Sequence, residues 1–149
     1  MNIGFLGLGK LGLPVSLAVE DKGHKVFGYD ISEQTISDIK NKKIRYREEW
    51  VDKYLPNTKL EITSIDDLVK NSEIIFVPIQ TPHDPAYEGV TRIPDKRIDF
   101  DYSYLKSGIK DLSEAIERNK EDKVVIIIST VLPGTIRSEI KPILGQHTK

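Results

Sequence analysis

Three glycines near the start of the chain have the spacing of a phosphate-binding turn. Gly7, Gly9 and Gly12 form a G-x-G-x-x-G pattern between the apolar run 2–6 and the segment 10–22, whose apolar residues have helical spacing. In such a turn the first glycine permits a tight bend, the second lets the backbone approach a pyrophosphate, and the third lets the helix pack close to the strand. The pattern therefore predicts a dinucleotide-binding turn. The alternative is a turn that serves packing alone.

An acidic side chain follows the glycines near the required distance. Asp30 ends the apolar run 25–29, close to the position about 20 residues on where such turns carry an acid. A carboxylate there accepts hydrogen bonds from the adenosine ribose hydroxyls and repels a 2′-phosphate. No arginine stands among Ile31, Ser32 and Glu33, so the sequence favours NAD over NADP. The alternative for Asp30 is a helix cap.

Two more polar segments follow predicted strands. In "VPIQTPHDP" (77–85), Thr81 is placed to hydrogen-bond a cofactor that crosses the strand ends. The same stretch also fits a proline-punctuated exit into a loop, and the residues alone do not separate the two. In "STVLPGT" (129–135), the residues alone favour Ser129 or Thr130 as a helix cap over a contact with a nicotinamide.

The remaining polar candidates carry less information. His83 and Asp84 stand in the predicted loop 80–99, and no histidine or acidic cluster has zinc-like spacing, so no metal site is predicted. The run 40–50 is basic and aromatic, but two glutamates lie within it, which favours a solvated charged face over an anion site.

Length and composition limit the function classes. A chain of 149 residues suits one domain. The formal net charge of -1, with both signs spread along the chain, argues against a nucleic-acid face or a membrane-binding helix. The absence of cysteine excludes disulfide and thiolate chemistry within this chain. The first residues resemble a strand rather than a signal peptide, and no stretch is as apolar as a membrane span. A cytoplasmic domain is expected.

The order of the elements predicts the fold class. Strands are expected at 2–6, 25–29, 59–63, 73–79 and 123–128, and helices at 10–22, 32–41, after Ser64, at 101–119 and at 133–144. The stretch 42–55 is expected to be irregular. Alternating strands and helices predict an α/β fold, a Rossmann-like doubly wound parallel sheet with helices on both faces. Its ligand would lie at the carboxyl ends of the strands, where the polar features above fall.

The motifs together resemble a known family. "GLGKLGLPVSLAVEDKGHKVFGYD", "VPIQTP" and "STVLPGT" occur in this order, at matching intervals, in the N-terminal domain of UDP-glucose/GDP-mannose dehydrogenases. "DFDYSYL" (99–105) resembles the Asp-Leu-Ser-Tyr-Val helix start of that family. The resemblance spans residues 1 to about 144. It implies that 1–149 form one NAD-binding domain, with the middle and C-terminal domains of the family absent from this chain.

The resemblance also implies roles for particular residues. Asp30 would hold the adenosine ribose, and Thr81, beside Pro82, would contact the cofactor. Thr130 matches the active-site threonine, whose hydroxyl helps to order the water or substrate near the nicotinamide; this replaces the capping role for Thr130 and leaves it open for Ser129. The pyrophosphate would be lined by Gly7, Gly9, Lys10, Leu11 and Gly12.

The family oxidises the C6 alcohol of a nucleotide sugar to a carboxylate with NAD. Its nucleophilic cysteine and most of its substrate contacts belong to the C-terminal domain, so the isolated chain is expected to bind NAD and turn over little. The longer form is a candidate homo-oligomer. The sequence departs from the family at Ile128, where a lysine is frequent, in the long loop 82–99, and near 46–52, where Glu-Pro-Gly-Leu has no clean match. The alternatives are the NAD-binding domain of a β-hydroxyacid dehydrogenase and a non-catalytic nucleotide-binding module.

Overall fold

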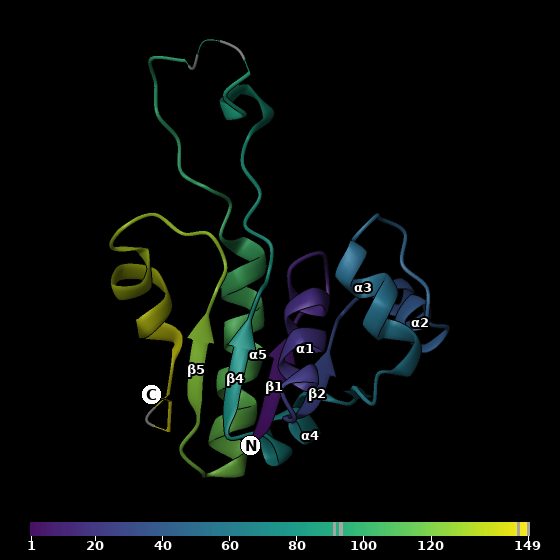
Figure 1. The fold of residues 1–149 in the computed structure, drawn as a ribbon. Helices are drawn as coiled ribbons and strands as arrows, with labels where there is room; N and C mark the ends of the chain where they lie inside the picture. The colour runs from purple at the N-terminus through teal and green to yellow at the C-terminus, as the bar shows by residue number, and fades with distance from the viewer. Residues whose placement is uncertain (91, 93, 146, 149) are drawn as a thin grey trace.

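One parallel sheet forms the centre of the molecule. The computed structural model describes residues 1–90, 92, 94–145 and 147–148. Its five strands lie in the order β3-β2-β1-β4-β5, and each neighbouring pair is parallel (Figure 1). They are β1 (Asn2–Leu6), β2 (Lys25–Tyr29), β3 (Glu61–Ile62), β4 (Ile74–Val77) and β5 (Val124–Ile127). The strand order reverses between β1 and β4, so the predicted Rossmann-like fold is confirmed.

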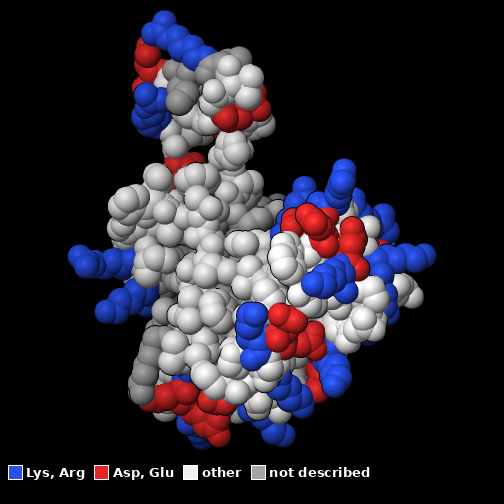
Figure 2. Space-filling model, viewed as in Figure 1, with Lys and Arg blue, Asp and Glu red and all other residues white. Residues whose placement is uncertain are grey.

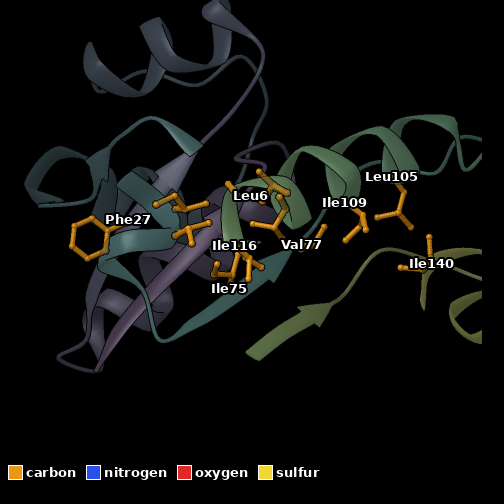
Figure 3. Close-up of a cluster of buried hydrophobic side chains, with 12 residues drawn as sticks. Leu6, Phe27, Ile75, Val77, Leu105, Ile109, Ile116 and Ile140 are labelled. Atoms are coloured by element: carbon orange, nitrogen blue, oxygen red, sulfur yellow. The ribbon is translucent and has the colours of Figure 1, made fainter. Parts of the chain in front are cut away.

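Helices cover both faces of this sheet. They are α1 (Gly12–Asp21), α2 (Glu33–Lys40), α3 (Glu49–Tyr54), α4 (Ile65–Asn71) and α5 (Ser103–Asn119). One core cluster joins Leu13 of α1 and Val51 of α3 to Phe5 of the sheet. The other joins Ile109 of α5 to Ile75 of β4, both labelled in Figure 3. Because side chains alternate along each strand, the two clusters lie on opposite faces.

Serine side chains cap the first turns of two helices. The Ser32 hydroxyl oxygen accepts a hydrogen bond of 3.2 Å from the Thr35 N–H at the start of α2. Ser64 accepts one of 3.1 Å from the Asp67 N–H at the start of α4. Both are capping arrangements that satisfy a free N–H of the first turn.

Two segments differ from the prediction. The expected irregular stretch 42–55 contains α3, which packs against α1 and continues into the 3-10 turn η1 (Leu55–Asn57), because Val51 and Leu55 lie one turn apart and are both buried. The expected helix 133–144 begins later. Gly134 turns the chain with φ +97°, and the π-helix η3 (Ile136–Ile140) and the 3-10 turn η4 (Lys141–Ile143) follow. Pro142 lies inside η4 and has no N–H to continue a regular helix.

The predicted loop after β4 extends from the body as an arm, seen at the top of Figure 1. It holds the 3-10 turn η2 (Pro85–Tyr87). Its base is closed by a 2.8 Å hydrogen bond from the Asp101 N–H to the Pro82 carbonyl. Its two sides are joined by the Tyr87 hydroxyl, which donates to the Lys96 carbonyl at 2.5 Å. Figure 2 shows charged side chains gathered at the tip of this arm.

Candidate functional site: a pocket at the carboxyl ends of the strands

A pocket of about 730 Å³ lies at the carboxyl edge of the sheet, where the strand order reverses. This is the position where open α/β sheets bind their ligands. The pocket brings together most of the residues that the sequence singled out. Those in its lining are Gly7, Gly9, Lys10, Leu11, Asp30, Thr81 and Thr130. Gly12 and Pro82 lie outside the lining.

The three glycines of the turn have three different environments. Gly7 has φ +116°, in the region that favours glycine. Gly9 is open: no heavy atom of the described residues lies within 4 Å of the position that a Cβ would occupy. At Gly12 a Cβ would lie 2.1 Å from the Gly7 carbonyl oxygen. Gly12 therefore permits the close packing of α1 on the turn, whereas Gly9 leaves backbone exposed to the pocket.

The Asp30 carboxylate holds the glycine turn against the end of β2. Its Oδ2 accepts a 2.7 Å hydrogen bond from the Leu8 N–H, and its Oδ1 accepts one of 2.8 Å from the Ser32 N–H. The helix-cap alternative for Asp30 is wrong, because Ser32 caps α2. A carboxylate has about four acceptor positions, so Asp30 retains lone pairs for a ligand hydroxyl.

Hydroxyl groups join the exits of β4 and β5 at the other end of the pocket. Thr81 donates from Oγ1 to the Thr130 carbonyl at 2.7 Å. Ser129 donates from Oγ to the Val77 carbonyl at 3.1 Å. The capping role left open for Ser129 is therefore wrong, since no side chain caps the start of η3. The exposed Thr130 hydroxyl forms no hydrogen bond with another described residue, so it is available to a ligand.

Tyr102 joins the arm to this end of the pocket; it lies in the segment 99–105 that resembles the family's helix start, but the sequence assigned it no role. Its ring is buried. Its hydroxyl donates to Asp99 Oδ1 at 2.6 Å and accepts from the Leu132 N–H at 3.1 Å. The base of the arm, the start of α5 and the segment after Thr130 are thus connected through one phenol group.

One wall of the pocket was missed by the sequence reasoning. Tyr104, Ser107, Gly108 and Asp111 of α5 all line it. These positions follow the i, i+3, i+4, i+7 spacing of one helix face, and that was the available signal. Polar residues with this spacing are equally typical of a solvent-exposed helix face, so the sequence alone did not identify them as part of a pocket.

The charges in the lining are divided between its parts. Lys10 stands at the glycine turn next to the positive N-terminal end of α1, and no ion pair joins it to another described residue. Asp30 and Asp111 provide carboxylates elsewhere in the lining. A cation and free backbone N–H groups suit a phosphate, and a carboxylate suits a hydroxyl. The residues present therefore fit a dinucleotide.

The weaker sequence candidates lie outside this pocket. His83 sits on the arm with its ring centroid 6.2 Å from that of Phe100, and Asp84 accepts a hydrogen bond from the Ala86 N–H. In the basic run, Arg45 pairs with Asp38 at 2.6 Å, as expected of a solvated charged face. Over the ranges that the structure describes, no His, Cys, Asp and Glu side chains gather as a metal cluster, and no helix has the length and apolarity to cross a membrane.

Comparison with known proteins identifies relatives over nearly the whole chain. The model of the UDP-glucose/GDP-mannose dehydrogenase family, NAD binding domain, matches residues 1–149. Protein CapL of Staphylococcus aureus is 33% identical over 147 residues, which are 99% of this chain and 31% of that protein. A UDP-N-acetyl-D-mannosamine dehydrogenase of Pyrococcus horikoshii is 32% identical over 91% of this chain and 30% of its own.

The structural comparison agrees. A ternary complex of GDP-mannose dehydrogenase from Pseudomonas aeruginosa has a TM-score of 0.79 and 26% identity, covering 96% of this chain and 31% of that one. The chain spans about a third of the length of the curated relatives that it matches. The chain therefore belongs to the UDP-glucose/GDP-mannose dehydrogenase family, of which it forms the NAD-binding domain.

Proposed function

We propose that this domain serves a nucleotide-sugar 6-dehydrogenase, which oxidises the C6 alcohol of a UDP- or GDP-linked sugar to a carboxylate. The observation that carries the proposal is one pocket in which the glycine turn, Asp30, Thr81 and Thr130 meet at the strand ends. NAD, when bound there, accepts the hydride. The chain's own residues bind it and orient it. The family assignment leaves the β-hydroxyacid dehydrogenase alternative without support.

The glycine-turn end holds the adenosine diphosphate half of the cofactor. Gly7 and Gly9 bring backbone close to the pyrophosphate, and Gly12 lets the N-terminus of α1 point toward it. Lys10 and Leu11 complete this part of the lining, the first with a positive charge. Asp30 accepts hydrogen bonds from the ribose hydroxyls with the lone pairs that Leu8 and Ser32 leave free.

The exits of β4 and β5 face the nicotinamide. Thr130 offers an exposed hydroxyl that orients a water molecule or the sugar hydroxyl. Thr81 contacts the cofactor and, by donating to the Thr130 carbonyl, fixes the backbone from which that hydroxyl projects. Pro82 acts from outside the lining, because its carbonyl closes the base of the arm.

The rest of the reaction requires groups that this chain does not carry. The family route holds the aldehyde on a cysteine thiol, and the chain has no cysteine. We therefore place the substrate grip and the nucleophile in a C-terminal domain of a longer protein, which we propose to be a homo-oligomer. We also propose a cytoplasmic location and a role in polysaccharide synthesis. The isolated chain should bind NAD and oxidise no sugar nucleotide.

Two measurements on the purified chain test this proposal. Calorimetric titration should give tighter binding of NAD than of NADP, because Asp30 repels a 2′-phosphate. Incubation with NAD and UDP-glucose, GDP-mannose or UDP-N-acetylmannosamine should produce no sustained NADH absorbance. Addition of a separately expressed C-terminal portion should restore turnover, and Thr130→Ala should abolish it again. Failure to bind NAD would overturn the proposal. Turnover by the chain alone would overturn the assignment of substrate binding and the nucleophile to a C-terminal domain.

A further inference from the structure

The wall that α5 contributes to the pocket has no role in the function proposed above. Asp111 of this wall forms no hydrogen bond or ion pair with another residue in the described part of the chain. Lys106, nearer the start of the same helix, instead pairs with Glu139 at 2.8 Å. Asp111 is therefore a carboxylate in the pocket lining that the fold does not use.

Contacts on either side locate Asp111 along the pocket. Gly108 backs onto the exit of β4, since a Cβ there would lie 2.2 Å from Ile79 Cδ1. Further along α5, Arg118 donates to Asp66 at the start of α4 at 2.8 Å. Asp111 stands on the turns between these two contacts. It thus lies on the stretch of α5 that runs from the β4 exit toward the start of α4.

The dinucleotide of the proposed function runs in a defined direction through this pocket. Its pyrophosphate lies at the glycine turn and its adenosine ribose at Asp30. The nicotinamide half extends toward Thr81 and Thr130, so the base beyond the ribose extends the other way. Ile31, directly after Asp30, and Ile65, at the start of α4, line the pocket together with Asp111. Ile31 is 86% exposed, which leaves an apolar side chain open to the face of a base.

We propose that Asp111 recognises the adenine ring by accepting a hydrogen bond from its exocyclic 6-amino group. The inference rests on the proposed function, because it uses the position of the ribose at Asp30. An ionised carboxylate can only accept hydrogen bonds, so it matches an amino group and opposes a carbonyl. Asp30 then selects the ribose without a 2′-phosphate, and Asp111 selects the base. The site discriminates against dinucleotides whose purine carries an oxygen at position 6.

Nicotinamide hypoxanthine dinucleotide is the matched probe, because it replaces the 6-amino group of NAD with a carbonyl. Titration by calorimetry should show about tenfold weaker binding of this probe than of NAD to the unmodified chain, the size expected when a hydrogen bond to a charged group is lost. In Asp111→Asn the amide can donate to the carbonyl, so the ratio of the two affinities should fall to about one.

Glu114→Gln is the control variant. It removes one carboxylate from an exposed position of α5 outside the pocket lining, and it should keep the affinity ratio of the unmodified chain. Equal binding of NAD and the hypoxanthine dinucleotide to the unmodified chain would overturn the role of Asp111 while leaving NAD binding intact. An unchanged ratio in Asp111→Asn would do the same. Absence of NAD binding would instead overturn the proposed function and this inference together.

Discussion

The two ends of the pocket differ in the groups that form their surfaces. At the glycine turn, glycines and backbone N–H groups form the surface, and the Asp30 carboxylate accepts from the Leu8 N–H across 22 residues of sequence. At the exits of β4 and β5, the contacts join hydroxyls to carbonyls over sequence separations of 49 and 52 residues. The first end depends on glycines that leave space for the backbone, held by Asp30, whereas the second depends on the hydroxyl side chains of Thr81 and Ser129.

This difference sets the cost of substitution at each end. A side chain added at Gly12 meets backbone that cannot move without shifting β1 or α1, so steric strain decides the result there. A hydroxyl removed at the strand exits costs about one hydrogen bond and leaves space behind. We therefore expect effects on stability and binding to decrease from the glycine turn to the exits.

Gly12→Ala should have the largest effect on stability. The new Cβ would stand 2.1 Å from the Gly7 carbonyl oxygen, and we expect the free energy of unfolding to fall by about 3 kcal/mol. Gly9→Ala is the matched control, since its Cβ has open space and should leave stability unchanged within about 0.5 kcal/mol. Guanidinium titration measures both. Equal stability of the two variants would contradict the packing role of Gly12.

Gly9→Val separates binding from folding at the same turn. The valine side chain would fill the space where the backbone faces the pocket, so NAD affinity should fall by at least about 100-fold. The fold should remain, because no described heavy atom lies within 4 Å of the added Cβ. Circular dichroism and calorimetry are the two measurements. A folded variant that binds NAD normally would show that the turn serves packing alone.

Asp30→Ala should lower both the stability of the fold and the preference for NAD over NADP, by intermediate amounts. It removes the acceptor of the Leu8 and Ser32 N–H groups, and we expect a loss of about 2 kcal/mol in stability. It also removes the charge that repels a 2′-phosphate, so the preference for NAD over NADP should decrease. Asp30→Asn keeps one carbonyl acceptor and should lose less stability. An unchanged NAD/NADP affinity ratio in both variants would contradict the ribose role.

The same contrast explains what could be predicted from the sequence. The Rossmann-like parallel fold, the glycine turn and Asp30 could be predicted, because each depends on residue patterns within short stretches. The partners of Thr81 and Tyr102 were not predictable, because those hydrogen bonds connect distant segments. Helix α3 was missed because Val51 is its one buried residue, and the next buried residue, Leu55, already belongs to η1. Asp111 was missed because a pocket wall and a solvated face share the same helical spacing.

Thr81→Val tests the exit end directly. Loss of the 2.7 Å hydrogen bond to the Thr130 carbonyl should lower the free energy of unfolding by about 1 kcal/mol. Thr81→Ser retains the hydroxyl and should keep most of that stability. Thr130→Val should leave stability unchanged within about 0.5 kcal/mol, because its hydroxyl bonds to no other described residue. Denaturant titration of the three variants measures these free energies of unfolding. A Thr81→Val variant as stable as the unmodified chain would contradict a stabilising role for the hydrogen bond from Thr81 to the Thr130 carbonyl.

The smallest effect concerns acid stability at the base of the arm. The Ser103 hydroxyl, and secondly the Ser103 N–H at 2.9 Å, hold the pKa of Asp101 below its ordinary value. Because the folded pKa is the lower one, ionised Asp101 stabilises the fold fully above its unfolded pKa of about 3.9. That stabilisation disappears as the pH falls through the folded pKa.

Asp101→Asn keeps an acceptor for the Ser103 N–H but has no charge to lose. The difference in unfolding free energy between the two proteins should therefore shrink as the medium is acidified. Ser103→Ala removes the largest cause of the lowered pKa of Asp101. The unfolding free energy of this variant should therefore depend less on pH than that of the unmodified chain. A difference that stays constant from neutral to acid pH would show that the carboxylate charge at Asp101 does not stabilise the start of α5.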